Sequence, residues 1–199
     1  MPVSIISICN LALSHVGGFS IAAVDERSTE GRLCGQHYDF CRDEVLRSFN
    51  WTFATKITPL AMVSGVSVPN WEYTYALPAD CLNARRIVFE GSGALPDTLQ
   101  RFTIISSSSG TTKYLCTNLE GAWLEYTARI TDPAMYDSQF VTAFAYRLGA
   151  DMATALSGVE GKRRELMNFF SMAIAEAKAS SANEQKDPQK FTRYVRSRQ

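Results

Sequence analysis

The chain has no net charge, because its 20 lysines and arginines are balanced by 20 aspartates and glutamates. A neutral protein has no overall attraction to nucleic acid or to an anionic membrane, so any such attraction must come from a local cluster of charges. With 46% hydrophobic and 20% charged residues, the 199-residue chain has the composition of a folded globular protein. Its length fits one domain, with room for an insertion.

The side chains and motifs that most often carry out catalysis are scarce. There are only two histidines, His15 and His37, and both fall in predicted helices far apart in the sequence. The chain has no Gly-Lys-Ser or Gly-Lys-Thr phosphate loop and no Gly-x-Ser-x-Gly nucleophile motif, and the glycines at 91 and 93 are too few for a dinucleotide fingerprint. We therefore expect no enzymatic activity and no cofactor.

Closely spaced cysteine pairs are also missing. Without a Cys-x-x-Cys pair, the usual spacing of a zinc site or a thioredoxin-like site is absent. Cys34 and Cys41 lie two helical turns apart, about 10 Å, which is too far for a disulfide. We expect no metal site and buried, reduced thiols at all five positions, which are Cys9, Cys34, Cys41, Cys81 and Cys116.

No segment has the features of a secretion signal or a membrane span. Residues 1–18 are apolar, but they lack a basic leader, include Asn10 and His15, and are too short to cross a bilayer. We expect a protein that is made inside a cell and does not contact a membrane.

Apolar residues recur at intervals of three and four in four segments, which predicts four helices. The helices are expected over about residues 3–16, 28–49, 134–157 and 160–182. Asp132-Pro133 supplies a capping aspartate and a proline suited to the first helical position, so we expect the third helix to begin there. The short connection at Ser157-Gly158 predicts that the last two helices form an antiparallel hairpin.

The residues between the second and third helices have a different character. β-branched and aromatic residues dominate, and turn residues recur about every ten positions, which predicts an antiparallel β insertion over about residues 52–131. The predicted fold class is therefore α+β, a mainly α-helical bundle of about four helices with this insertion between the second and third. Its strands are expected near Thr52–Leu60, Glu72–Ala76, Ala84–Glu90, Arg101–Ser106, Lys113–Thr117 and Ala122–Ile130.

The end of the chain differs again. Residues 186–199 hold five basic side chains against one acidic one, and we treat them as an extended tail that follows a single domain of residues 1–185. Phe191, Tyr194 and Val195 suit folding onto another subunit. Two alternatives stay open: the basic side chains neutralise DNA phosphates, or the tail frays without a partner.

One segment, WEYTYALPADCLNARRIV at residues 71–88, combines a strand pattern with an abrupt break. Tyr73 and Tyr75 alternate on one strand face, and Pro78 ends the ladder because it has no amide proton to donate. Asp80 is placed to accept hydrogen bonds from turn amides. We interpret the segment as a corner that turns the chain within the β insertion and locks it to the helices, with a generic corner of an α+β protein as the alternative.

Together with LRSFNWTFA at residues 46–54, this segment resembles the tail tubular protein A family, the head-to-tail adaptors or gatekeepers of short-tailed phages. In that family, a helix-to-strand passage of the first type precedes a strand–turn–strand of the second type. The resemblance covers roughly residues 3–180, and residues 42–88 carry most of its specificity. Both motifs are structural rather than reactive.

The resemblance implies a structural virion protein made in the host cytoplasm. Family members look like wedge-shaped subunits of a twelve-fold ring beneath the portal, which joins the DNA-filled head to the tail nozzle and lines part of the exit channel for genome ejection. The implied partners are further copies of the chain, the portal, the nozzle protein, tail fibres, and phage DNA through non-specific contact. A head-completion or stopper protein that binds the portal is an alternative, and a DNA-binding module and a glycan hydrolase are less favoured ones.

A closed ring of identical subunits needs two different, complementary surfaces on each subunit. The polar face of the second helix and the start of the fourth are candidates, with solvated faces as the alternative. The candidate subunit-interface residues are Arg32, Asp39, Asp43, Arg47, Arg163 and Arg164. The candidate residues for binding the portal or a neighbouring subunit are Lys190, Phe191, Arg193, Tyr194, Val195, Arg196 and Arg198.

Overall fold

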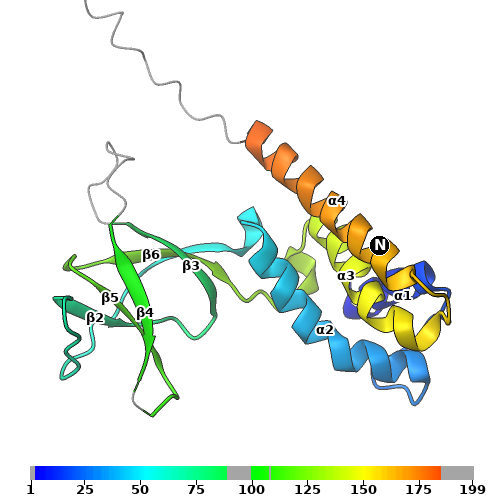
Figure 1. The fold of residues 1–199 in the computed structure, drawn as a ribbon, viewed down its shortest axis with the longest axis horizontal. Helices are drawn as coiled ribbons and strands as arrows, with labels where there is room; N and C mark the ends of the chain where they lie inside the picture. The colour runs from blue at the N-terminus through cyan, green and yellow to red at the C-terminus, as the bar shows by residue number, and fades with distance from the viewer. Residues whose placement is uncertain (1–2, 89–99, 108, 185–199) are drawn as a thin grey trace, which may run out of the picture. The chain divides into compact units, whose positions relative to one another are not determined.

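The computed structural model describes residues 3–88, 100–107 and 109–184 of the chain. Within them it has the predicted α+β fold with four α-helices, and its strands form two antiparallel sheets of three strands each (Figure 1). The chain divides into two compact units. The helical unit contains the residues up to Cys41 and those from Asp137 onward, and the β unit contains Arg42–Tyr136.

Helix α1, Ile5–Val16, has both of its ends fixed by local interactions. The backbone amide of Ser7 donates to the Ser4 hydroxyl at 3.1 Å, and the amide of Ser4 donates to the Ser7 hydroxyl at 2.8 Å, which makes a reciprocal cap. Gly17, with φ of 77°, ends the helix in the left-handed conformation that glycine adopts without strain. The helix buries Ile8, Cys9, Ala12, Leu13 and Val16.

Helix α2, Thr29–Ser48, runs from the helical unit into the β unit, because the unit boundary follows Cys41. In the helical unit it buries Cys34, Tyr38 and Cys41. The Tyr38 ring lies 4.9 Å from the ring of Phe144. The face of α2 that carries the apolar residues of the sequence pattern is therefore the buried one.

Helix α3, Ser138–Leu156, begins later than the sequence predicts. Pro133–Met135 form a separate 3-10 turn capped by Asp132, and Tyr136 is extended, so the start expected at about residue 134 was wrong. Tyr136 is held there because its hydroxyl donates to the Ile130 carbonyl at 2.9 Å. Asp137 then caps α3 by accepting from the Phe140 amide at 2.6 Å.

Helices α3 and α4, Lys162–Glu184, form the predicted hairpin. Gly158 and Gly161 in the connection have φ of 59° and 86°, which other residues rarely adopt. Gly149 allows α1 and α3 to approach closely, because a Cβ atom built on it would lie 3.2 Å from the Ala12 carbonyl oxygen. Helix α3 buries ten of its residues, including Phe140, Phe144 and Leu148.

The β unit contains two sheets with one common core. The first sheet has the order β1-β6-β3 and the second β2-β5-β4. The core cluster draws Ile87, Leu124 and Tyr126 from the first sheet and Tyr75 and Leu115 from the second. The strands are β1 Thr55–Pro59, β2 Tyr73–Ala76, β3 Cys81–Val88, β4 Phe102–Ser106, β5 Lys113–Thr117 and β6 Trp123–Ala128.

These strands lie where the sequence predicts them, with differences at the ends. The first begins at Thr55, because Thr52–Ala54 form a 3-10 turn. The third begins at Cys81, before its predicted start, and the predicted end at Phe89 and Glu90 lies outside the described residues. The tail of residues 186–199 also lies outside them.

Candidate interaction surfaces and the residues that shape them

The break at Leu77-Pro78-Ala79-Asp80 carries the chain from one sheet to the other. Strand β2 before it belongs to the second sheet and strand β3 after it belongs to the first. The amide of Cys81 donates to the Pro78 carbonyl at 3.0 Å, which closes the turn. A proline suits this position because the ladder of β2 has to stop before the chain changes sheets.

Asp80 also fixes this corner through two side chains that the sequence did not indicate. Its carboxylate accepts from Lys56 Nζ at 2.7 Å and from the Tyr126 hydroxyl at 3.0 Å. Lys56 lies in β1 and Tyr126 in β6, so the turn is tied to two strands of the first sheet. Burial and the hydrogen bond to Asp80 raise the pKa of Tyr126 above its usual range.

Trp51, the tryptophan of LRSFNWTFA, closes the end of α2. Its side chain is 1% exposed, and its indole Nε1 donates to the Val45 carbonyl at 2.9 Å. The last four carbonyls of a helix have no partner within the helix, and Val45 is among them. Phe49 packs edge-on against the indole with ring centroids 5.0 Å apart. The segments at residues 46–54 and 71–88 therefore both shape junctions of the β unit.

The predicted interface residues on α2 differ in their surroundings. Arg32, Asp39 and Arg47 are exposed. Asp43 is half-buried and forms internal ion pairs, at 2.8 Å to Arg42 and 2.8 Å to Arg129. Asp43 thus helps to hold the β unit together, which was not predicted.

Arg163 and Arg164, the predicted interface residues of α4, are both exposed. Arg163 lies 3.7 Å from Asp151, which also accepts from Arg147 at 2.6 Å and from the Cys41 thiol at 3.2 Å. Burial alone would raise the pKa of Asp151, but the hydrogen bonds from Arg147 and Cys41 outweigh it and lower the pKa. A carboxylate that stays ionised in this way ties α2 and α4 to α3.

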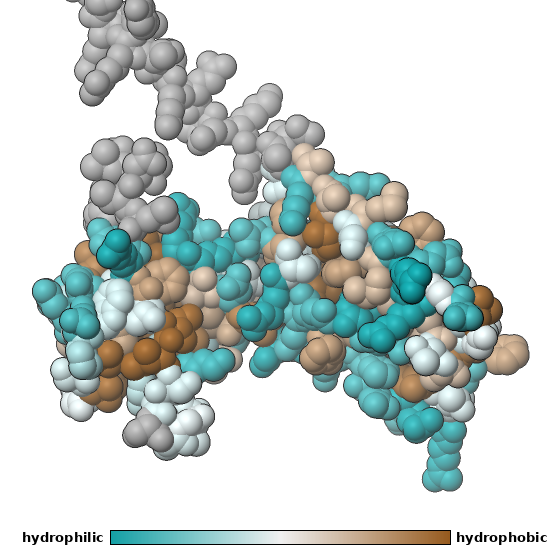
Figure 2. Space-filling view, viewed as in Figure 1, coloured by the Kyte–Doolittle hydropathy of each residue, from teal (hydrophilic) through white to brown (hydrophobic). Residues whose placement is uncertain are grey.

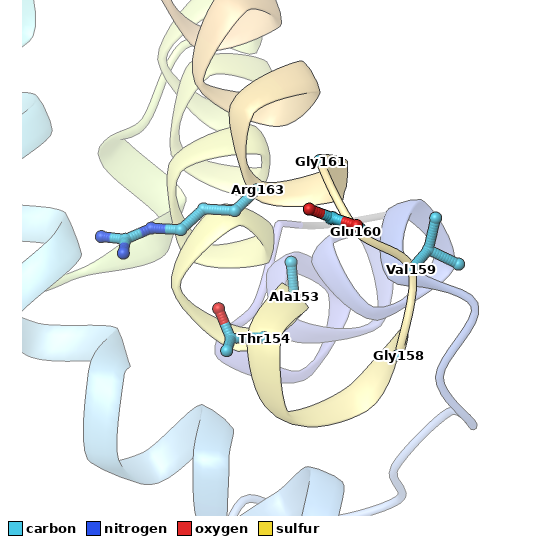
Figure 3. Close-up of a pocket in the computed structure, with 7 residues that line it drawn as sticks. All are labelled: Ala153, Thr154, Gly158, Val159, Glu160, Gly161 and Arg163. Carbon is cyan, nitrogen blue, oxygen red and sulfur yellow. The ribbon is translucent and has the colours of Figure 1, made fainter.

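A pocket lies beside Arg163 at the connection between α3 and α4 (Figure 3). Its volume is about 390 Å³, and its lining has one acidic and one basic side chain, Glu160 and Arg163. In Figure 3 the Arg163 side chain extends from α4, while Val159 and Glu160 project from the connecting loop. The lining includes neither His nor Cys, and its one hydroxyl belongs to Thr154.

The helical unit also exposes large apolar side chains that the sequence pattern did not single out. Phe40 on α2 is 66% exposed, and Met172 on α4 is 58% exposed. Phe169 on α4 is 39% exposed, and its ring lies 5.5 Å from that of Tyr146. Figure 2 shows hydrophobic residues among hydrophilic ones on the surface of this unit. Helical periodicity identifies a buried face but does not show where its margin lies.

Other predicted features are placed as follows. All five cysteines are free thiols, and four of them are buried. The seven candidate binding residues of the tail lie outside the described residues. Within residues 3–88, 100–107 and 109–184, no three His, Cys, Asp or Glu side chains are grouped to hold a metal ion. Over the same residues, the helices lack the combined length and hydrophobicity needed to cross a bilayer.

No protein-family model matches the chain, and a search of curated proteins gives no match.

Proposed function

We propose that this protein is a structural component of a phage virion, a head-to-tail adaptor similar to tail tubular protein A. Copies of the chain form a ring that joins the portal to the tail nozzle and lines the exit channel for DNA. Its action is assembly, and it makes and breaks no covalent bonds.

The observation that carries this proposal is the role of the two family-like segments. In LRSFNWTFA, Trp51 caps the end of α2 and leads the chain into β1. In WEYTYALPADCLNARRIV, the proline turn takes the chain from β2 in one sheet to β3 in the other. These are the helix-to-strand passage and the strand–turn–strand that the resemblance implies, and they stand in the implied order between two pairs of helices.

The chemistry of the described surface also favours assembly over catalysis. The lining of the pocket at the α3–α4 connection includes neither His nor Cys, and His15, half-buried against Tyr146 with ring centroids 4.7 Å apart, has its pKa lowered first by burial. Exposed aromatic and methionine side chains on helices are typical of protein interfaces. The net charge of zero gives the whole chain no attraction to DNA, which suits a channel wall better than a DNA-binding module.

The test is to mix the purified full-length chain with the portal protein encoded in the same genome and to image the mixture by electron microscopy. We expect rings of the chain stacked in register on portal rings. A chain that binds the tail only after another protein has occupied the portal would instead identify a head-completion or stopper protein. A chain that never binds the portal or itself would contradict the proposal.

Deletion of residues 186–199 tests the proposed role of the tail. We expect the shortened chain to keep its circular dichroism spectrum and melting temperature but to lose attachment to the portal, because the tail's aromatic and basic side chains would be its anchors. The matched control replaces the tail with a glycine–serine segment of the same length. Unchanged attachment of the shortened chain would remove the tail from the proposal.

A further inference from the structure

The outer face of α2 in the helical unit presents an aromatic side chain on the same side of the helix as a basic one. Arg32, Gln36 and Phe40 recur every four residues, so they form one stripe along the helix, and all three are exposed. A phenylalanine that is 66% exposed at the centre of a helix contributes nothing to the core of its own unit. We call these three residues the α2 stripe.

The side of α4 that borders its buried face presents a second stripe of different chemistry. Glu165, Phe169, Met172 and Glu176 follow one another at intervals of four, three and four, which places them on one side of the helix. Two apolar side chains thus lie between two carboxylates. Tyr146 of α3 extends the apolar surface, because its ring packs on Phe169. We call Glu165, Phe169, Met172 and Glu176 the α4 stripe.

The two stripes lie on different sides of the helical unit, because α3 separates the helices that carry them. On α3, Phe144 packs on Tyr38 of α2, whereas Tyr146 packs on Phe169 of α4. Two residues along a helix correspond to a rotation of about 200°, so these contacts point in nearly opposite directions. Figure 1 shows α3 between α2 and α4 in this unit.

The stripes are complementary in charge and in character. The α2 stripe combines an aromatic ring with a guanidinium, and the α4 stripe combines an apolar pair with two carboxylates. Arginine with a carboxylate gives a geometrically specific pair, and an aromatic ring inserted among apolar side chains is a common energetic centre of an interface. Asp39 lies beside the α2 stripe, and Lys162 forms an ion pair of 3.2 Å with Glu165 at one end of the α4 stripe, so both would restrict the register.

We propose that the α2 stripe of one copy of this chain packs on the α4 stripe of the next copy. Phe40 lies against Phe169 and Met172 of the neighbour, and Arg32 faces its glutamates. Such a contact is heterologous, so a pair of copies keeps one unused α2 stripe and one unused α4 stripe, and further copies add until the ring closes. This inference rests on the proposed function, because only an assembling chain needs both surfaces.

Site-directed cross-linking tests the pairing directly. One full-length chain carries Phe40→Cys and another carries Met172→Cys, and the two are mixed with and without the portal and oxidised with diamide. We expect a disulfide-linked dimer in the mixture, located by mass spectrometry at residues 40 and 172, and none when either variant is oxidised alone. Phe19→Cys, at an 84% exposed position outside both stripes, is the matched control and should give no dimer with Met172→Cys.

A second variant measures how much the Phe40 side chain contributes to the free energy of assembly. Phe40→Asp should raise the protein concentration needed for assembly at least about tenfold, because it removes the aromatic anchor and places a carboxylate against Phe169 and Met172 of the neighbour. Its melting temperature should match that of the wild type, since the side chain is exposed. Phe19→Asp should assemble as the wild type does.

The outcomes separate this inference from the proposed function. If the wild type forms rings on the portal but residues 40 and 172 do not cross-link and Phe40→Asp assembles normally, the stripe pairing is wrong and the adaptor function stands. Cross-links of residue 40 to residue 40 would also overturn the pairing, because they indicate a two-fold contact. If the wild type assembles neither alone nor with the portal, both the adaptor function and the pairing fail.

Discussion

Asp80 is a turn residue whose carboxylate connects three parts of the β unit. It lies in the turn between β2 and β3, and it binds Lys56 of β1 and Tyr126 of β6. Burial alone would raise its pKa, but these two hydrogen bonds and the charge of Lys56 outweigh burial and hold the pKa below its usual value. The ionised form is therefore the one that the folded chain favours.

Replacing Asp80 by Ala should lower the free energy of unfolding by about 1–2 kcal/mol at pH 7, because one ion pair and one hydrogen bond are lost. A carboxyl with a lowered pKa stabilises the fold above its unfolded pKa, about 4, and this stabilisation disappears as the pH falls through the folded value. The difference between wild type and variant in urea unfolding should therefore shrink between pH 7 and pH 3.

The matched control for Asp80 is Glu72→Ala, which removes an exposed acid from the same unit. Its effect should stay within about 0.5 kcal/mol at both pH values. An Asp80→Ala variant as stable as Glu72→Ala at pH 7 would show that the corner does not depend on this carboxylate.

At the scale of elements, the junction between α2 and β1 depends on Trp51. The indole donates to the Val45 carbonyl and is packed by Phe49, so the end of the helix and the start of the strand share one buried side chain. The C-terminal end of α2 belongs to the β unit, whereas its first turns belong to the helical unit. The Trp51 side chain therefore both caps the C-terminal end of α2 and fills part of the hydrophobic core.

Replacing Trp51 by Phe keeps a ring in the core but removes the indole N–H and part of the volume. We expect the free energy of unfolding to fall by about 1–3 kcal/mol, because the buried Val45 carbonyl loses its donor. Hydrogen exchange should accelerate at the amides of the last turn of α2. Trp71→Phe is the control, since Trp71 is only half-buried, and a Trp51→Phe variant no less stable than this control would contradict the account.

The elements themselves follow from local patterns in the sequence. Apolar residues at intervals of three and four mark all four helices, and β-branched and aromatic runs mark all six strands, because these patterns depend on neighbours in the chain. Strand pairing depends on distant partners. Thr55 faces Thr127 and Tyr73 faces Thr117, and nothing local to either residue specifies that match. The division into two sheets was for that reason not predicted.

Departures from the pattern arise where tertiary contacts decide the outcome. The start of α3 was predicted too early because Asp132-Pro133 has the chemistry of a helix start, but Tyr136 binds Ile130 and interrupts the helix. Asp43 was predicted as an interface residue because it lies on the polar side of α2. Its ion pair with Arg129, far away in the sequence, is an internal contact that the pattern does not predict.

At the scale of the whole molecule, the proposal requires many copies of one chain to act together. The helical unit supplies two complementary stripes on either side of α3, and the β unit supplies corners that fix the direction of its strands. A ring built in this way needs no catalytic group, and its strength comes from the same weak contact repeated at each boundary between copies.

Native mass spectrometry of the full-length chain bound to its portal tests this claim most directly. The proposed adaptor predicts one discrete complex in which the copies of the chain form a closed set, expected to number about twelve as the family resemblance implies. A chain that stays monomeric in the presence of the portal, and instead converts a small molecule or a polysaccharide in the same sample, would contradict the account.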